Sequence, residues 1–356
     1  MLNKAIAHIL ERKDIRLLTK PSTARCNVDK YTYFLMSEPK YSGCCRLAEV
    51  LEVSRYSTNR FLLREQYNPQ DLFREVRGHL NLRGGVLSAD DTVIEKLDSD
   101  VRKTQLLGYY WSGKHKKAIK GINLITLYYT DPIRRSMPVN YRLYNPLDRK
   151  TKNDYLREMI EEVISWGVKP STVTTDCWYA SKKNLKFFRD KKLNFQVGIA
   201  KNRQFKVEAG EYDRVENLAI TEEGLSVTLK EFGKIKVFKR TFKDGSCRYY
   251  ATFRFQEFEL TNWTRLQFRE LQSIHWGIEC YHRALKQLCG LSKFQVRKTE
   301  AIVTHVFCSL RAFCQLELMR ISEEIESWYS LKKELSLKVS REFIKKRLSS
   351  PISLAT

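Results

Sequence analysis

Apolar residues recur at helical spacing over residues 268–290. They advance by three or four residues at a time: Leu271, Ile274, Ile278, Tyr281 and Leu285. That spacing places them on one stripe of an α-helix that packs against a core. A polar stripe lies beside it and carries a single acid among possible donors: Gln272, His275, Glu279, His282, Arg283 and Lys286. Two interpretations are open, an ordinary amphipathic helix with a solvated face or a helix that carries an active-site acid.

The first 80 residues are predicted to be helical and separate from the rest of the chain. The stretch 45–67 resembles a helix-turn-helix, with an apolar helix around Leu47–Leu51, a break at Val53–Ser54 and a second helix from near Ser57. We expect that second helix to reach the bases and phosphates of a DNA major groove with a set of polar side chains. These are Tyr56, Thr58, Asn59, Arg60 and Arg64. A small helical hairpin without DNA contact would show the same pattern.

From residue 82 the pattern changes to alternating strands and helices. A strand should precede Asp90, and two more are expected at 121–130 and 136–145. The remaining elements are expected as a helix at 153–167, a strand at 173–175, a helix from 181 to 188 and a strand at 194–202. This order predicts an α/β fold with a mixed sheet flanked by helices.

Residues 203–260 read as a β-rich insertion, because short alternating segments are separated by glycine-containing turns. Its basic side chains could lie along a phosphate backbone or be solvated charges: Lys230, Lys234, Lys236, Lys239, Arg240, Lys243 and Arg248. The helix at 296–321 should cover the sheet. The predicted divisions are 1–80 (helical DNA-binding region), 81–202 (first part of the core), 203–260 (insertion), 261–325 (second part of the core) and 326–356 (basic helical tail).

The net charge of the chain indicates which class of partner it binds. Lys and Arg number 64 against 41 Asp and Glu, a net charge of +23 that indicates a polyanion such as double-stranded DNA. No membrane is expected, because the chain has no run of 18 apolar residues and no cleavable leader, and we expect it in the cytoplasm. Its nine cysteines include no C-x-x-C, which favours reduced thiols over a zinc site.

Three carboxylates stand where a metal-dependent phosphoryl-transfer site would need them. Asp90 and Asp91 come directly after the apolar run of the first strand, Asp176 ends a later strand, and Glu279 is the acid of the polar stripe. Carboxylate oxygens suit Mg²⁺, and two such ions can stabilise the attacking and leaving oxygens of an in-line displacement. Adjacent strand residues point to opposite faces, so only one of the two first aspartates can serve. We expect Asp91, with Asp90 as its competitor.

The segment HWGIECYHRALK resembles the glutamate region of DDE transposases from bacterial insertion sequences, specifically the insertion-sequence-4 type. Glu279 and Lys286 match the E and K of its Y-(2)-R-(3)-E-(6)-K signature, and SADDTV and VTTDCWYA resemble the regions around the two aspartates. The resemblance covers roughly residues 40–320. It implies a ribonuclease-H-like core in which Asp91, Asp176 and Glu279 bind two Mg²⁺ ions, for which Mn²⁺ would substitute.

The same resemblance implies a reaction. A bacterial transposase of this type binds the terminal inverted repeats of its own element, as a homodimer on DNA, cleaves there and joins the 3′-hydroxyl to target DNA. Lys286, His275 and Arg283 would flank the DNA, although Gln272 and His275 stand where the signature has Tyr and Arg. Two alternatives stay open: a non-catalytic DNA-binding protein, domesticated or inactive, and a stand-alone nuclease of the same fold.

Overall fold

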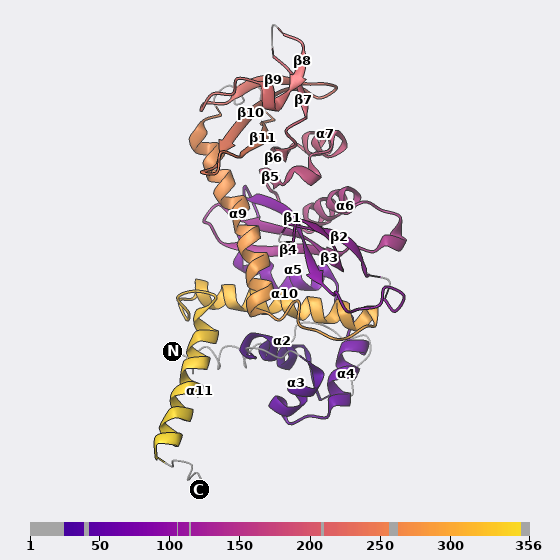
Figure 1. The fold of residues 1–356 in the computed structure, drawn as a ribbon, viewed down its shortest axis with the longest axis vertical. Coiled ribbons are helices and arrows are strands. Elements are labelled where there is room, and N and C mark those ends of the chain that lie inside the picture. Colours follow the sequence, from indigo (N-terminus) through magenta and orange to yellow (C-terminus); the bar gives the residue numbers. More distant parts are fainter. Residues whose placement is uncertain are drawn as a thin grey trace. The chain divides into compact units, whose positions relative to one another are not determined.

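The computed structural model describes residues 25–38, 43–104, 106–113, 115–207, 210–255 and 263–349. The start of the predicted N-terminal region, the end of the insertion (256–260) and the end of the tail (350–356) lie outside them. The chain forms two compact units, drawn in Figure 1. The first comprises residues 1–72, 102–104 and 281–356, and the second comprises residues 73–101 and 105–280.

The second unit is built on one mixed sheet. Its described strands are β1 (Val86–Glu95), β2 (Gly108–Ser112), β3 (Lys117–Thr130), β4 (Ser136–Leu143), β5 (Thr172–Thr175), β6 (Asn194–Ile199), β7 (Gln204–Lys206), β8 (Tyr212–Arg214), β9 (Leu225–Leu229), β10 (Gly233–Thr241) and β11 (Cys247–Phe253). The order is β2-β3-β1-β5-β6-β11-β10-β9-β7-β8, with β4 paired to β3. Strands β1, β5 and β6 are parallel, and the pairs around them are antiparallel. The predicted α/β fold with a mixed sheet is therefore confirmed.

The insertion strands do not form a separate sheet. Strand β11 pairs antiparallel with β6, so the hairpin β10–β11 continues the core sheet beyond its parallel centre. The segments read as strands from their alternation, β9 to β11, are strands in the structure. Strand β2, which pairs with β3, was not expected from the sequence. The insertion can therefore bring its side chains to the same face of the sheet as those of β5 and β6.

Helices cover both faces of this sheet (Figure 1). On one face lie α6 (Lys152–Ser165) and α7 (Lys182–Asp190), where the Asn140 amide of β4 donates to the Met159 carbonyl of α6 at 3.2 Å. On the other lies the first part of α9 (Arg265–Leu288), where the Gln196 amide of β6 donates to the Phe268 carbonyl at 3.3 Å. Helix α9 begins three residues before the expected start and ends two residues before the expected end.

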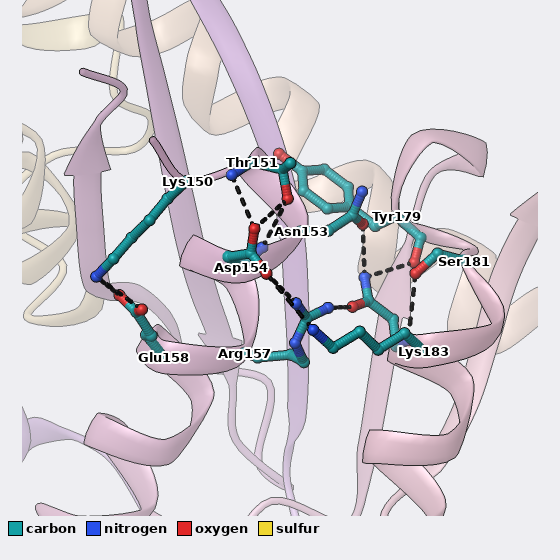
Figure 2. Close-up of polar contacts among 10 residues, drawn as sticks. Lys150, Thr151, Asn153, Asp154, Arg157, Glu158, Tyr179, Ser181 and Lys183 are labelled. Carbon is teal, nitrogen blue, oxygen red and sulfur yellow. Dashed lines mark hydrogen bonds and ion pairs between the residues drawn. The ribbon is translucent and has the colours of Figure 1, made fainter. Parts of the chain in front are cut away.

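A hydrogen-bond network joins α6 to the loop that precedes α7, and Figure 2 shows its members Asn153, Arg157 and Tyr179. Asn184 donates to the Tyr179 carbonyl at 2.9 Å and to Asn153 Oδ1 at 2.7 Å, while its own carbonyl accepts from Arg157. Thr151 caps α6 reciprocally with Asp154. The start of α6 and the loop after β5 are thereby fixed to each other.

The first unit is organised around α10 (Thr299–Ile321). This helix, expected on the sheet, instead packs against α2 (Val28–Ser37) and α4 (Arg55–Arg64). It is long and apolar enough to cross a membrane, but 94% of its most apolar window is buried within the structure, which is typical of a core helix. Two of its buried polar side chains are paired with α2: His305 Nδ1 is 2.8 Å from the Tyr31 hydroxyl, and Arg311 is bonded to Asp29 at 2.7 Å.

The other described helices are short or terminal. They are α3 (Cys44–Leu51), α5 (Pro69–Val76) and α11 (Ser330–Ser349), with single turns η1 (Arg77–His79), η2 (Pro146–Asp148), η3 (Cys177–Tyr179) and η4 (Val215–Asn217). The pair α3 and α4 matches the expected helical hairpin. Its second helix starts at Arg55 because Ser54 caps it, accepting from the Tyr56 N–H at 3.2 Å.

Candidate active site

Polar side chains form a row across the centre of the sheet, on the face that α9 covers. Ser88 of β1 and Thr174 of β5 are partners in the parallel register, and their hydroxyl oxygens are 2.9 Å apart. Thr174 Oγ1 is also 3.2 Å from Nδ1 of His275, on α9. Because side chains alternate along a strand, the residues two positions onward, Asp90 and Asp176, fall on this same face.

The register therefore distinguishes the two adjacent aspartates. Asp90 shares the face of Ser88 and so lies beside Asp176, whereas Asp91 points to the face covered by α6. This corrects the expectation that Asp91 faces the α9 side. The physical reason is the parallel pairing of β1 with β5, which sequence alone does not fix.

Asp91 is held by protein donors on both oxygens. Its Oδ1 accepts from Lys152 Nζ at 2.9 Å and from the Tyr179 hydroxyl at 2.9 Å. Its Oδ2 accepts from Lys152 at 2.8 Å and from the Asn123 amide. The ammonium of Lys152 in turn lies 4.7 Å from the centre of the exposed Trp178 ring. Asp91 is a charge-balanced anchor for α6 and η3 rather than an open ligand.

Asp176 is the carboxyl group of the site whose pKa is shifted. Burial, then the neighbouring charges of Asp90 and Asp91, raise the pKa of Asp176 from 3.8 to about 7. Its Oδ1 accepts the Trp178 N–H at 3.0 Å, which caps η3. Gly198 of β6 lets the backbone approach, because a Cβ there would be 2.9 Å from the Cys177 nitrogen. Crowded carboxylates of this kind attract a cation.

A cleft of about 1180 Å³ opens between α9 and the strand ends. Asp176 and Glu279 both line it, with His275 and Gln272 on the α9 wall. The remaining lining residues are mainly basic and aromatic: Lys201, Arg240, Phe242, Arg248, Tyr249, Tyr250, Arg265, Phe268, Arg269 and Trp276, with smaller residues between them. Such a surface suits a polyanion that meets carboxylates at one point.

The donor set fits Mg²⁺ by its chemistry. Carboxylate oxygens come from Asp90 on β1, from Asp176 directly after the neighbouring strand β5, and from Glu279 on α9. Within the described part of the chain, no three His, Cys, Asp or Glu side chains are grouped closely enough to hold an ion by themselves. The candidate metal ligands are therefore the adjacent Asp90 and Asp176, together with Glu279, which lines the same cleft as Asp176.

The other predicted site residues lie in the first unit. On α9, Arg283 is exposed and Lys286 is half-buried, beyond the part of the helix that covers the sheet. On α4, Tyr56, Arg60 and Arg64 are exposed and Asn59 is half-buried. Thr58 is fully buried, so the expectation that it reaches DNA is wrong.

Comparison with known proteins decides the family. The family described as Transposase DDE domain matches residues 84–314, which include the strands, the insertion and the glutamate helix. The chain belongs to this transposase family. A comparison with curated proteins gave no match.

Two of the solved structures that match this DDE transposase are themselves transposases. The piggyBac transposase synaptic complex with hairpin DNA aligns over 100% of this chain and 79% of that chain, with 13% identity and a TM-score of 0.50. The Drosophila P element transposase strand transfer complex aligns over 60% of this chain and 53% of that chain, with 12% identity and a TM-score of 0.20. The first supports the fold.

Sequence reasoning missed three parts of the site. Lys152 and Tyr179, whose side chains hold Asp91, were not singled out: Lys152 belongs to no motif, and Tyr179 lies within the segment VTTDCWYA but was given no role. A signal for Asp90 was present, since Ser88 precedes Asp90 on β1 as Thr174 precedes Asp176 on β5, and both pairs are polar at two-residue spacing. The basic residues of the insertion, Arg240 and Arg248 among them, were noted as possible phosphate contacts, but the aromatic lining from the insertion, including Tyr250, gave no signal before the register was known.

Proposed function

We propose that this chain is an insertion-sequence transposase that cleaves DNA at the ends of its element and joins the freed strand to target DNA. The observation that carries the proposal is that Asp176 and Glu279, far apart in sequence, line one basic cleft, with Asp90 beside Asp176 on the adjacent strand. Family membership supports the class of activity. The parallel arrangement of β1, β5 and β6 supports a ribonuclease-H-like core.

In this mechanism Asp90, Asp176 and Glu279 would hold two Mg²⁺ ions, with Mn²⁺ as a substitute. Such ions supply an activated oxygen nucleophile and stabilise the charge that develops on the scissile phosphate. The protein orients the acids: η3 and Gly198 fix Asp176, and the strand register fixes Asp90. Asp91 acts through Lys152 as a positioning residue.

The remaining site residues would contact DNA. His275, whose ring is oriented by Thr174, would present its edge to the phosphates in the cleft. Arg283 and Lys286 of α9 would contact DNA as well, and Tyr56, Asn59, Arg60 and Arg64 of α4 would read the terminal repeats. We also propose a homodimer on DNA in a bacterial cytoplasm, associated with the nucleoid when bound, and no membrane.

The test is metal-dependent cleavage of a linear duplex that carries the DNA flanking the gene. Wild type should cut and join it with Mg²⁺, and Glu279→Gln should bind the same DNA without cutting. A chain that binds but never cuts would be a non-catalytic DNA-binding protein. One that hydrolyses DNA without joining strands would be a stand-alone nuclease.

A further inference from the structure

Two arginines face each other at the cleft, on the insertion hairpin. The register pairs Arg240 of β10 directly with Arg248 of β11, and both exposed side chains line the cleft that contains Asp176 and Glu279. Like charges opposite each other on an antiparallel pair are destabilising. Within the described part of the chain, both guanidinium groups contact aromatic side chains. A pair kept at this cost in the free protein indicates an anionic ligand.

An aromatic ring holds the two guanidinium groups. The ring centre of Phe242 is 4.8 Å from Cζ of Arg240 and 5.2 Å from Cζ of Arg248, and Phe242 also lines the cleft. The adjoining turn fixes it, because the Phe242 N–H donates to the Ser246 carbonyl at 2.9 Å and Gly245 adopts a φ of 77°. Cation–π contact on one ring presets both groups, so less rotamer freedom is lost when a ligand binds.

Tyr250 lines the cleft beside the two arginines and Phe242. It lies two residues after Arg248 on the same face of β11, and its ring packs edge-on to Phe268 of α9 at 5.3 Å. Burial raises the pKa of the Tyr250 hydroxyl, the charges of Arg248 and Arg240 and a hydrogen bond with Arg248 lower it, and Glu279 raises it. The tyrosine, the arginines and the glutamate thus lie within electrostatic reach of one another.

We propose that Arg240 and Arg248, braced by Phe242 and backed by Tyr250, clamp one phosphate of the DNA strand that is cut. Gln272 and His275 stand on α9 where the signature has Tyr and Arg, and this hairpin brings a tyrosine and two arginines to the same cleft. The guanidinium fork matches phosphate oxygens bidentately, which a single histidine does not. This inference rests on the proposed function and assigns positioning residues to it.

The experiment uses the full chain, Mg²⁺ and the gene-flanking duplex, with single phosphates near the cut replaced by neutral methylphosphonates. Arg240→Ala and Arg248→Ala should each slow cleavage about 10- to 100-fold, the loss expected for a charge-assisted hydrogen bond to phosphate. Arg248→Lys should recover only part of the rate. Arg214→Ala, an arginine of the same insertion outside the cleft lining, is the charge-matched control and should stay within about twofold of wild type.

Two further readouts separate a clamp from a structural role. The unfolding temperature of the DNA-free Ala variants should hold or rise, because a repulsive pair is relieved. One methylphosphonate should slow wild type and have no added effect in the Ala variants. Inorganic phosphate, added to wild type at equal ionic strength, should not slow cleavage as the methylphosphonate does. This result would exclude a binding site for the free phosphate ion.

The outcomes distinguish this inference from the proposed function. If wild type cuts and joins DNA but both Ala variants match Arg214→Ala, the clamp is wrong and the proposed function stands. If both Ala variants unfold at lower temperature and the methylphosphonate effects are unchanged, the arginines are structural. If wild type never cuts, the proposed function fails, and the clamp is then tested by measuring the affinity of each protein for the methylphosphonate duplexes. If the methylphosphonate weakens binding by the same factor in wild type and in both Ala variants, the clamp is wrong.

Discussion

Replacing each of the two adjacent aspartates with asparagine, one at a time, tests most directly the assignment that rests on the strand register. Asp90→Asn removes a carboxylate beside Asp176, and Asp91→Asn removes the partner of Lys152. The two variants differ by one residue and carry the same change of charge. We expect opposite results: the first should be folded and inactive, and the second less stable but active.

The magnitudes depend on the surroundings of each carboxylate. The Asp91–Lys152 pair is mostly buried, with side-chain exposures of 13% and 17%, so loss of one partner leaves an uncompensated ammonium. Breaking a buried pair costs roughly 3–5 kcal/mol, and partial solvent access reduces this to about 2–3 kcal/mol. For a domain of this size the unfolding temperature should fall by roughly 5–10 °C. Asp90→Asn should not lower it, because one of the charges that raise the pKa of Asp176 is removed.

Catalysis should show the reverse order. A lost metal ligand should reduce cleavage by at least about 10³-fold, because several kcal/mol of charge stabilisation disappear. Asp91→Asn should stay within about tenfold of wild type when assayed well below its unfolding temperature. The measurements are thermal unfolding by circular dichroism and Mg²⁺-dependent cleavage of the cognate end. An Asp91→Asn protein that is folded yet as inactive as Asp90→Asn would refute the assignment.

Three further predictions concern acidity, α9 and α4. The raised pKa of Asp176, about 7 against 3.8, means that the folded protein keeps a proton that the unfolded chain has released, so this contribution to metal-free stability is full below pH 4 and lost as pH rises through 7. Asp176→Asn should therefore flatten stability between pH 4 and 8 by up to roughly 4 kcal/mol in chemical denaturation, and an unchanged profile would contradict the shift. His275→Arg should retain or increase strand transfer and His275→Ala should lower it, whereas wild-type rates for both variants would show that the position is not used. Reversing the charge of Arg60 or Arg64 should weaken binding to the element ends and reduce its salt dependence in fluorescence anisotropy, while cleavage of pre-nicked DNA is less affected; a flat salt response of wild type would count against DNA as partner.

Local patterns in the sequence determined most elements of the structure. The stripe on 268–290 predicted α9, and the alternation around Lys236 and Tyr250 predicted strands in the insertion, because side-chain periodicity reflects which face of a single element is buried. Net charge and the segment around Glu279 pointed to DNA and to the family that the comparison then matched.

Long-range pairing decided the site. Whether Asp90 or Asp91 faces α9 depends on how β1 pairs with β5, and a shift by one residue would exchange them. The opposition of Arg240 and Arg248 likewise exists only because β10 and β11 pair in this register, at the end of a sheet that the insertion extends. Sequence specifies the period of each strand, but the relative phase of two strands is set by contacts between residues far apart in the chain, and only the tertiary structure shows it.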